Sequence, residues 1–452
     1  MAEEFFARQV GRFISDSDAA ALPESVVEYG KMVLASTLAS AALGSTLDSS
    51  KIVRRQEISR GGNTSASAWF GEWERLPSVA CARLNALMSD AAASDDSDLR
   101  NIVHSGTPAT AAALAVGQEV NASGSEIVHA IVLGYEVAGT INTGVIGGLQ
   151  RKGFHGCVVA TFAAAAAAAR LYKLNEEQAA NALSLTATSM GGLHAVAAVS
   201  LAREFHAGNA AMVGVQCAQA AALGYASAPD AFDMKRGFFA TLGNGNDISS
   251  LAAELGKKWN ILTELGVKLV PGGSPFHAVA EAAALAAEDG NLDVDDIRQI
   301  YFTLPDYPFP GPKRPADLIG IAHSPFYFAA AGAADREYGW QHAFAEKIQS
   351  PRIRSLFDRI ERDDREVVNK NEFKSGAIVR IEARDGRVFE RSVRYPKGAA
   401  VRGIDWNDLA GKYAALMPHG GLNALQIDDS LALVRELDKL PSIDSLFLSL
   451  RK

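Results

Sequence analysis

The spacing of apolar residues up to about residue 255 predicts consecutive α-helices joined by short loops. One helix begins at Pro23 and ends at Gly44, because apolar residues recur at helical spacing between these two boundary residues. The polar segments 123–126 and 175–178 start two further helices. Alanine-rich helices follow segment 153–156 and run over 209–223, so this part of the chain is expected to be all-helical.

The pattern changes beyond about residue 266, where β-rich runs appear at 300–304, 377–383 and 387–393. Asp385-Gly386 lies between the last two runs, which predicts a β-hairpin with a two-residue turn. Helical patterns separate the strands, at 278–287 and about 326–338, and return from Asp405. We therefore expect a mainly α protein, with an all-helical domain over 1–265 and 399–452 and an inserted, smaller α+β lid domain over 266–398.

The composition agrees with close-packed helices in a chain of more than one domain. The 452 residues are 48% apolar but only 8% aromatic, and the apolar excess is mostly alanine, which lets helices approach closely. The 44 basic and 52 acidic residues give a net charge of −8. This balance argues against a general electrostatic attraction to nucleic acid or to an anionic membrane.

The three cysteines, Cys81, Cys157 and Cys217, are widely spaced and form no CxxC pair. A disulfide framework or a structural zinc site is therefore not expected, and a reducing cytoplasm is the predicted location. The N-terminus lacks the apolar stretch of a signal peptide, and the apolar run 157–169 is too short to span a bilayer. No nucleotide-binding glycine motif occurs, and no two histidines have the spacing of helical metal ligands. We expect no cofactor and no metal.

Segment 94–108 is the most informative polar stretch, because acidic and hydroxyl residues lead into His104 between two apolar helices. It can present a histidine base with polar neighbours in a cleft, and the alternative is a solvated loop with helix caps. His155 comes just before an alanine-rich helix, where backbone N–H groups favour a carboxylate, unless it simply caps that helix.

Two later segments also carry candidate chemistry. Arg203 is expected just before a helix, where its guanidinium could hold a carboxylate, and the alternative is a surface pair with Glu204. Segment 268–277 joins the two expected domains and contains Lys268, a Gly-Gly-Ser turn and His277. Domain junctions favour clefts, so we prefer a functional role for this segment over a plain hinge.

In this order and at these separations, the four segments resemble the MmgE/PrpD family over essentially the whole chain. The motifs that carry the resemblance are Gly-Tyr-Glu-Val (134–137), Phe-His (154–155), His-x-Gly-Asn-Ala-Ala (206–211) and Lys-x-x-Pro-x-x-x-x-x-His (268–277). The family includes 2-methylcitrate dehydratase, cis-aconitate decarboxylase and iminodisuccinate epimerase. The resemblance implies a homodimer that acts on small polycarboxylates by removing a proton next to a carboxylate, without an organic cofactor or a metal.

Four histidine and lysine positions of the family map onto His104, His155, Lys268 and His277. Other family positions differ in this chain. The loop acid is replaced by Ala93, the loop threonine by Ser97, a lysine by Arg203, a histidine by Gly273 and a tyrosine by Phe309. Most of these changes remove groups that could protonate a carbanion or a leaving hydroxyl, and a guanidinium does not donate its proton at neutral pH.

These departures favour an epimerase that moves the proton α to a carboxylate of an imino- or amino-linked dicarboxylate such as iminodisuccinate. His104 and Lys268 are the candidate proton-transfer pair, with His155 as a third catalytic candidate. The expected substrate-binding residues are Asp95, Ser97, Arg203, Gly272, Gly273 and His277. The alternatives are a dehydratase or decarboxylase of a methylcitrate- or aconitate-like tricarboxylate, and a non-catalytic protein that binds polycarboxylates.

Overall fold

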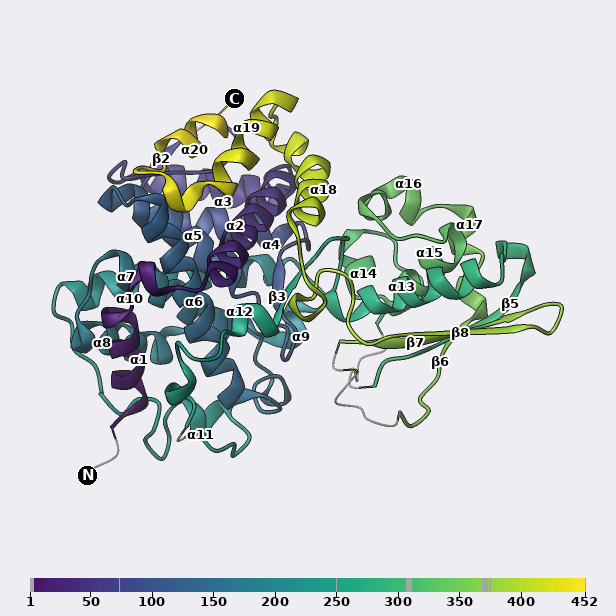
Figure 1. Cartoon of the computed structure of the whole chain (residues 1–452), viewed down its shortest axis with the longest axis horizontal. Helices are drawn as coiled ribbons and strands as arrows, with labels where there is room; N and C mark the ends of the chain where they lie inside the picture. Colours follow the sequence, from purple (N-terminus) through teal and green to yellow (C-terminus); the bar gives the residue numbers. More distant parts are fainter. Residues whose placement is uncertain are drawn as a thin grey trace. The chain divides into compact units, whose positions relative to one another are not determined.

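The computed structural model describes residues 4–72, 74–248, 250–305, 311–367, 373 and 375–451. The chain forms two units (Figure 1), which we call the helical unit (Met1–Val267 with Asp405–Lys452) and the mixed unit (Lys268–Ile404). Helices make up most of the regular structure, and the described strands form three small sheets. The prediction of a mainly α protein is therefore confirmed.

The helical unit contains long helices and two short two-stranded sheets, β1–β2 and β3–β4. Its elements are α1 (Phe6–Asp16), α2 (Glu24–Gly44), α3 (Asp48–Arg60), β1 (Ala66–Ser67), β2 (Arg75–Leu76), α4 (Ser78–Ala91), β3 (Asp96–Asp98), α5 (Gly106–Val120), α6 (Gly124–Val145), α7 (Cys157–Leu171), α8 (Glu176–Ser189), α9 (His194–Ala197), α10 (Ala202–Ala222), α11 (Phe238–Leu242), α12 (Asn260–Thr263), β4 (Leu265–Val267), α18 (Trp406–Leu416), α19 (Ala424–Arg435) and α20 (Asp444–Ser449).

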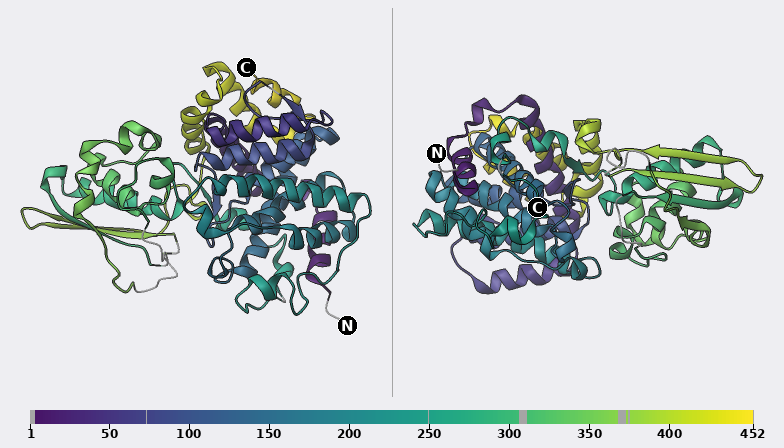
Figure 2. Two further views of the ribbon diagram at one scale, coloured as in Figure 1. Left: turned by 180° about the vertical axis from the view of Figure 1, so that it is seen from behind. Right: turned by 90° about the horizontal axis from the view of Figure 1, so that it is seen from below.

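The mixed unit is a four-stranded sheet with helices packed on one face (Figures 1 and 2). Its elements are α13 (Ser274–Asp289), β5 (Ile297–Thr303), α14 (Leu318–Ala322), α15 (Pro325–Asp335), α16 (Ala345–Ile348), α17 (Pro351–Arg354), β6 (Ile360–Arg362), β7 (Ala377–Ala383) and β8 (Val388–Val393). The strand order is β6-β5-β7-β8, with β5 and β6 parallel and the other neighbours antiparallel. Residues alternate between buried and half-buried along β7, because α13 covers only one face.

The hairpin predicted around Asp385-Gly386 is confirmed, but its turn is longer than expected. The Ala383 N–H donates to the Arg387 carbonyl at 2.9 Å, which leaves three residues in the connection. Among these residues, only Gly386 has a positive φ, of 90°. A three-residue loop that ends in a left-handed glycine replaces the predicted two-residue turn, in which both residues would need positive φ.

Close helix approach accounts for the alanine-rich sequence of α7. Every residue of Ala163–Ala169 is at most 1% exposed, and α5, α6 and α10 all contact this helix. Gly134 of α6 lies so close that a Cβ there would be 2.5 Å from the Ala163 carbonyl oxygen. A Cβ on Gly214 of α10 would be 2.7 Å from the Thr161 carbonyl oxygen. Larger residues at these crossings would force the helices apart.

Helix α2 is largely buried in the helical unit. By length and composition it could cross a bilayer, but 83% of its most apolar window is buried inside the protein. The C-terminal helices α18 and α19 contact it. The buried Lys412 of α18 donates from Nζ to Ser36 Oγ at 2.6 Å and also to the Ser94 carbonyl. Lys412 thereby links the C-terminal segment to α2 and to the start of residues 94–105 between α4 and α5, which we call the acidic segment.

Glu136 of α6 fixes the backbone that leads into β4. Its carboxylate accepts the N–H groups of Asn260 and Ile261, at 2.8 and 2.9 Å, at the start of α12. Burial raises the pKa of Glu136 to about 7, although these hydrogen bonds favour the charged form. Because β4 follows α12 directly and pairs with β3, Glu136 helps to position the strand that holds the acidic segment.

Candidate active site

The acidic segment between α4 and α5 is buried rather than solvated. Asp95, Asp96, Ser97 and Asp98 are each 0% exposed, and the last three form β3, paired antiparallel with β4. The alternative interpretation of a solvated loop is therefore wrong. The helix-capping part of that interpretation is correct, because Asp96 Oδ2 accepts the Gly106 N–H at 3.0 Å at the start of α5.

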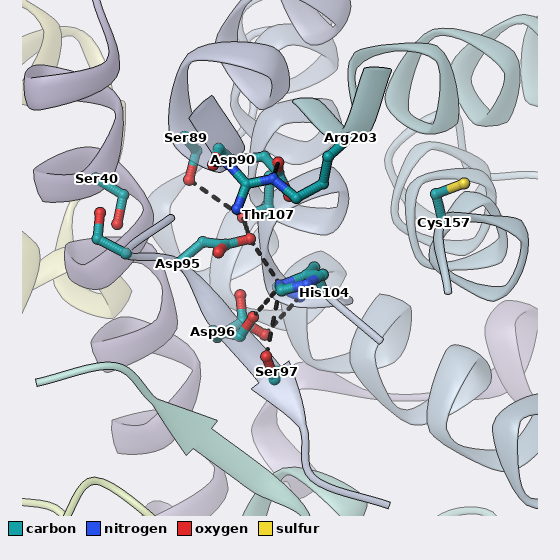
Figure 3. A network of polar contacts seen from close by, with 12 residues as sticks. Ser40, Ser89, Asp90, Asp95, Asp96, Ser97, His104, Thr107, Cys157 and Arg203 are labelled. Carbon is teal, nitrogen blue, oxygen red and sulfur yellow. Dashed lines mark hydrogen bonds and ion pairs between the residues drawn. The ribbon is translucent and has the colours of Figure 1, made fainter. Parts of the chain in front are cut away.

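His104 follows this strand and turns its Nδ1 toward oxygen atoms (Figure 3). The nearest are the Asp96 carbonyl at 2.7 Å, Asp95 Oδ2 at 3.0 Å and Ser97 Oγ at 3.5 Å. A carbonyl and a carboxylate only accept hydrogen bonds, so Nδ1 carries the proton in the neutral ring. The lone pair of the neutral imidazole is then on Nε2, which is the atom suited to accept a proton from a substrate.

Asp95 is held by a chain of polar contacts behind His104. The same Oδ2 atom accepts the Thr107 hydroxyl at 3.2 Å, and that hydroxyl lies 3.1 Å from Ser89 Oγ (Figure 3). The carboxylate is therefore placed to stabilise His104 when the ring becomes an imidazolium. This geometry makes Asp95 an orienting partner of His104, and its predicted role in binding substrate stays a prediction.

Arg203 lies inside α10, not before it as the sequence suggested. Helix α10 begins at Ala202 because Ala, Arg and Glu are good helix formers. Gly208 does not interrupt the helix, and it permits a close crossing with α4, where a Cβ would be 2.9 Å from the Arg83 carbonyl. The Arg203 Nε lies 3.0 Å from Asp90 Oδ1, and Nη2 donates to the Asp90 carbonyl at 2.8 Å.

The Arg203–Asp90 pair is nearly buried, with side chains 13% and 1% exposed. Burial alone would lower the pKa of Arg203, but the carboxylates of Asp90, Glu204 and Asp95 raise it above its ordinary value. The guanidinium thus has a protein carboxylate as its partner. Binding of a substrate carboxylate by Arg203 stays a prediction.

His155 precedes α7 and is held as a neutral ring. Burial lowers the pKa of His155 well below its usual value, and neighbouring imidazoles and the Arg203 guanidinium lower it further. The Cys157 N–H lies 3.4 Å from His155 Nδ1, which acts as the acceptor. The ring proton is then on Nε2, so His155 can donate a hydrogen bond to a substrate oxygen while His104 accepts a proton.

Two further histidines and a cysteine surround His155. Its ring centroid lies 5.4 Å from that of His206 and 6.2 Å from that of His194. Cys157, at the start of α7, donates from Sγ to the Gly191 carbonyl at 3.3 Å. Burial raises the pKa of the Cys157 thiol far above its ordinary value, so it is a neutral thiol at pH 7. No role is predicted from the sequence for Cys157 or His206.

The other predicted site residues belong to the mixed unit. Lys268 follows β4 directly in the chain and is 2% exposed. His277, in the first turn of α13, donates from Nε2 to the Gly272 carbonyl at 3.2 Å. The Gly273 N–H donates to the Ala322 carbonyl at 3.0 Å, so this predicted substrate donor already has a partner. Phe309, one of the family departures, lies outside the described residues.

The residues that hold the predicted ones in place are not evident from the sequence. Asp90 is 113 positions from Arg203, and Lys412 is 318 positions from Ser94. No local pattern indicates such pairs. The short His155-x-Cys157 spacing was a usable signal for a donor cluster, but His206 joins it only because α7 and α10 pack together.

The chain is similar in sequence to a known protein family and to several named proteins. The sequence profile of the MmgE/PrpD N-terminal domain matches residues 8–251, and that of the MmgE/PrpD C-terminal domain matches residues 271–430. Cis-aconitate decarboxylase of Homo sapiens is 27% identical over 353 residues, which cover 75% of this chain and 73% of the human protein. The protein of the same name from Mus musculus is 25% identical over 353 residues, which cover 75% and 72% of the two chains.

A third relative is the cis-aconitate decarboxylase-like protein oryM of Aspergillus oryzae (strain ATCC 42149 / RIB 40). It is 27% identical over 295 residues, covering 61% of each chain. The names of these relatives indicate decarboxylases, so they do not support the epimerase that the sequence analysis favoured. The two profiles together span most of the chain, and the chain belongs to the MmgE/PrpD family.

Proposed function

We propose that this protein is a lyase that acts on a tricarboxylate of the citrate or aconitate type. The relatives are named as cis-aconitate decarboxylases, which supports this class of substrate and reaction. The observation that carries the proposal is the orientation of His104, whose Nδ1 faces the Asp96 carbonyl and the Asp95 carboxylate. The Nε2 atom of the ring is then the group that exchanges a proton with the carbon next to a substrate carboxylate.

Both lyase reactions use a proton transfer between His104 Nε2 and a substrate carbon, but in opposite directions. In a dehydration, His104 Nε2 takes the proton from carbon, a C=C bond forms, and the hydroxyl leaves with a proton from an acid. In a decarboxylation, His104 first takes up a proton from solvent on Nε2. The bond to the leaving carboxylate then breaks, CO2 departs, and the carbanion takes this proton from the imidazolium. Asp95 stabilises the imidazolium in both cases, and His155 Nε2–H can hold a substrate oxygen. Lys268 stays a predicted proton-transfer residue together with His104, and a predicted source of positive charge for the carbanion.

An epimerase of iminodisuccinate is the second candidate. It is favoured by Ala93 and Gly273, which stand where the family has a loop acid and a histidine. Arg203 replaces a family lysine and is paired with Asp90, so it offers no exchangeable proton at neutral pH. Proton removal at one face of a carbon and return at the other would need only the remaining groups. A non-catalytic polycarboxylate-binding protein is a third possibility.

Proton NMR in D2O separates these functions. The purified protein is incubated in turn with cis-aconitate, citrate, 2-methylcitrate and one stereoisomer of iminodisuccinate. We expect a tricarboxylate to lose CO2 or water. If only iminodisuccinate reacts, with inversion and one solvent deuterium at the α-carbon, the lyase proposal fails and the epimerase stands. Thermal stabilisation by a tricarboxylate without turnover of any compound would instead indicate the binding protein.

His104→Gln tests the proposed base against a matched control. We expect it to lower kcat by about 10²- to 10⁴-fold, the usual contribution of a positioned acid or base. The control is His129→Gln, because His129 is also buried in the helical unit but contacts Ser17 Oγ, at 2.8 Å, outside the acidic segment. Equal activity of the two variants would remove His104 from the mechanism.

A further inference from the structure

Three metal-binding side chains converge beside the start of α7. One donor atom each of His155, Cys157 and His206 lies within 4.8 Å of the other two. His155 and Cys157 flank Gly156, and His206 is in the second turn of α10. Cys157 is buried, whereas both histidines are partly exposed to solvent.

The backbone of Gly192 shows that two of these donors face the same small space. A Cβ built on Gly192 would lie 2.5 Å from Cys157 Sγ and 3.2 Å from His206 Nδ1. His206 Nδ1 is buried and accepts or donates no hydrogen bond among the residues that the structure describes. A buried ring nitrogen without a partner is unusual, because burying a polar atom without a hydrogen bond is unfavourable. The position of His206 Nδ1 beside the Cys157 thiol suggests a metal ion as its partner.

Two imidazoles and a thiolate form a donor set that favours zinc and related transition-metal ions. Bonds of about 2.0–2.1 Å to nitrogen and about 2.3 Å to sulfur place tetrahedral ligand atoms roughly 3.5 Å apart. The observed separations of up to 4.8 Å need a contraction of about 1 Å, which rotation of the imidazoles can provide. On binding, Cys157 releases its proton to solvent and gives up its hydrogen bond to the Gly191 carbonyl.

We propose that His155, Cys157 and His206 form a binding site for zinc or a transition-metal ion of similar preference. Three protein ligands leave one coordination position for water or an added ligand. A second consequence rests on the proposed function. An ion on His155 withdraws this imidazole from the substrate, so the metal inhibits the enzyme, and removal of the metal by a chelator restores activity.

Cobalt binding tests the site without substrate, so its outcome does not depend on the proposed function. The full-length protein is stripped with a chelator, freed of it by gel filtration, and titrated with Co²⁺. We expect one Co²⁺ per chain and a thiolate-to-cobalt charge-transfer band in the near ultraviolet, which Zn²⁺ then abolishes. Cys157→Ser should lose the band. Cys81→Ser, at another buried cysteine, should keep it.

His206→Asn is the second variant and guards against a misfolded Cys157→Ser. It should weaken Zn²⁺ binding by more than about 10-fold, the lower limit for loss of an outer-shell partner of a metal. Circular dichroism of each variant reports whether the fold is retained. Absence of the band in the parent protein, its persistence in Cys157→Ser, or its equal loss in Cys81→Ser would each overturn the proposal.

Discussion

Replacing Arg203 with methionine removes the guanidinium that faces the buried carboxylate of Asp90. The two groups are 3.0 Å apart, and Asp90 is 1% exposed, so its charge has little access to water. The Asp90 carbonyl, at the C-terminal end of α4, also loses the donor at 2.8 Å. The variant therefore tests whether Arg203 stabilises the fold or is available to bind a substrate carboxylate.

The expected cost follows from the burial of the pair. Removing one partner of a buried ion pair destabilises a protein by about 3–5 kcal/mol, because the other charge stays buried without compensation. Since the Arg203 side chain is 13% exposed, we expect the lower end, about 3 kcal/mol. Arg203→Lys keeps the charge but not the planar set of donors. It should cost roughly 1 kcal/mol, the net value of one hydrogen bond.

Urea unfolding followed by tryptophan fluorescence measures the stability of the helical unit, to which Asp90 and Arg203 both belong. Four of the five tryptophans, all except Trp340, belong to the helical unit by their position in the chain. Asp90→Asn and the double variant with Arg203→Met complete a double-mutant cycle, which isolates the interaction of the pair. We expect the two single changes to be clearly non-additive.

Two results would contradict this reasoning. Stability of Arg203→Met within about 1 kcal/mol of the parent, a typical surface effect or less, would show that Asp90 does not need the guanidinium. Additive changes in the cycle would show the same. In either case Arg203 would be available to a substrate carboxylate. Arg203→Lys should then raise KM strongly while leaving stability almost unchanged.

Four further predictions follow from buried or exposed side chains. Asp95→Asn should lower kcat less than His104→Gln does, because the Asp96 carbonyl still holds His104 Nδ1. An equal loss of kcat would mean that the Asp95 carboxylate, and not this backbone carbonyl, orients the His104 ring. Lys412→Met should cost about 1–3 kcal/mol in urea unfolding by leaving its buried acceptors unpaired, and an unchanged midpoint would contradict this. Burial, with the nearby Arg170 charge, lowers the pKa of His129 to about 4, so only the unfolded state takes up this proton as the pH falls below 6.5. His129→Gln should therefore lose roughly 2 kcal/mol less stability than the parent between pH 7 and pH 5, and parallel pH profiles would refute this. Val199→Asp, at a side chain that is 77% exposed, should weaken the expected homodimer in light scattering if the apolar segment 193–201 lies in its interface, whereas an unchanged dimer would exclude that segment.

Elements that depend on neighbouring residues could be predicted from the sequence. The starts of α6 and α8 are set by capping boxes at Ser123 and Asn175, whose side chains accept hydrogen bonds three residues later. The β7–β8 hairpin follows from strand alternation around a glycine turn. The start of α10 was predicted too late because Gly208 resembles a helix boundary, although here it serves a crossing with α4.

The candidate site was predicted only in part, because its partners come from distant segments. His104 could be identified from its polar neighbours in the chain, but the burial of those neighbours could not, because it depends on the contacts of β3 with β4, α2 and α5. The predicted ligand role of Arg203 overlooked Asp90, which packing brings to it from α4. Side chains that recur in a local pattern are visible in one sequence, whereas contacts between helices depend on the whole core.

The burial of the acidic segment also explains why a histidine, rather than one of its carboxylates, is the proposed base. Asp96 accepts the Gly106 N–H, and Asp98 pairs with Arg100, whose Nε lies 3.0 Å from Asp98 Oδ1. Asp95 is directed to Nδ1 of His104. The contacted oxygens of these carboxylates hold the loop and the ring, and transfer of a substrate proton to one of them would weaken its contact. Nε2 of His104 can accept that proton without breaking the contacts on the other side of the ring, and Asp95 then faces the positive charge that the transfer creates.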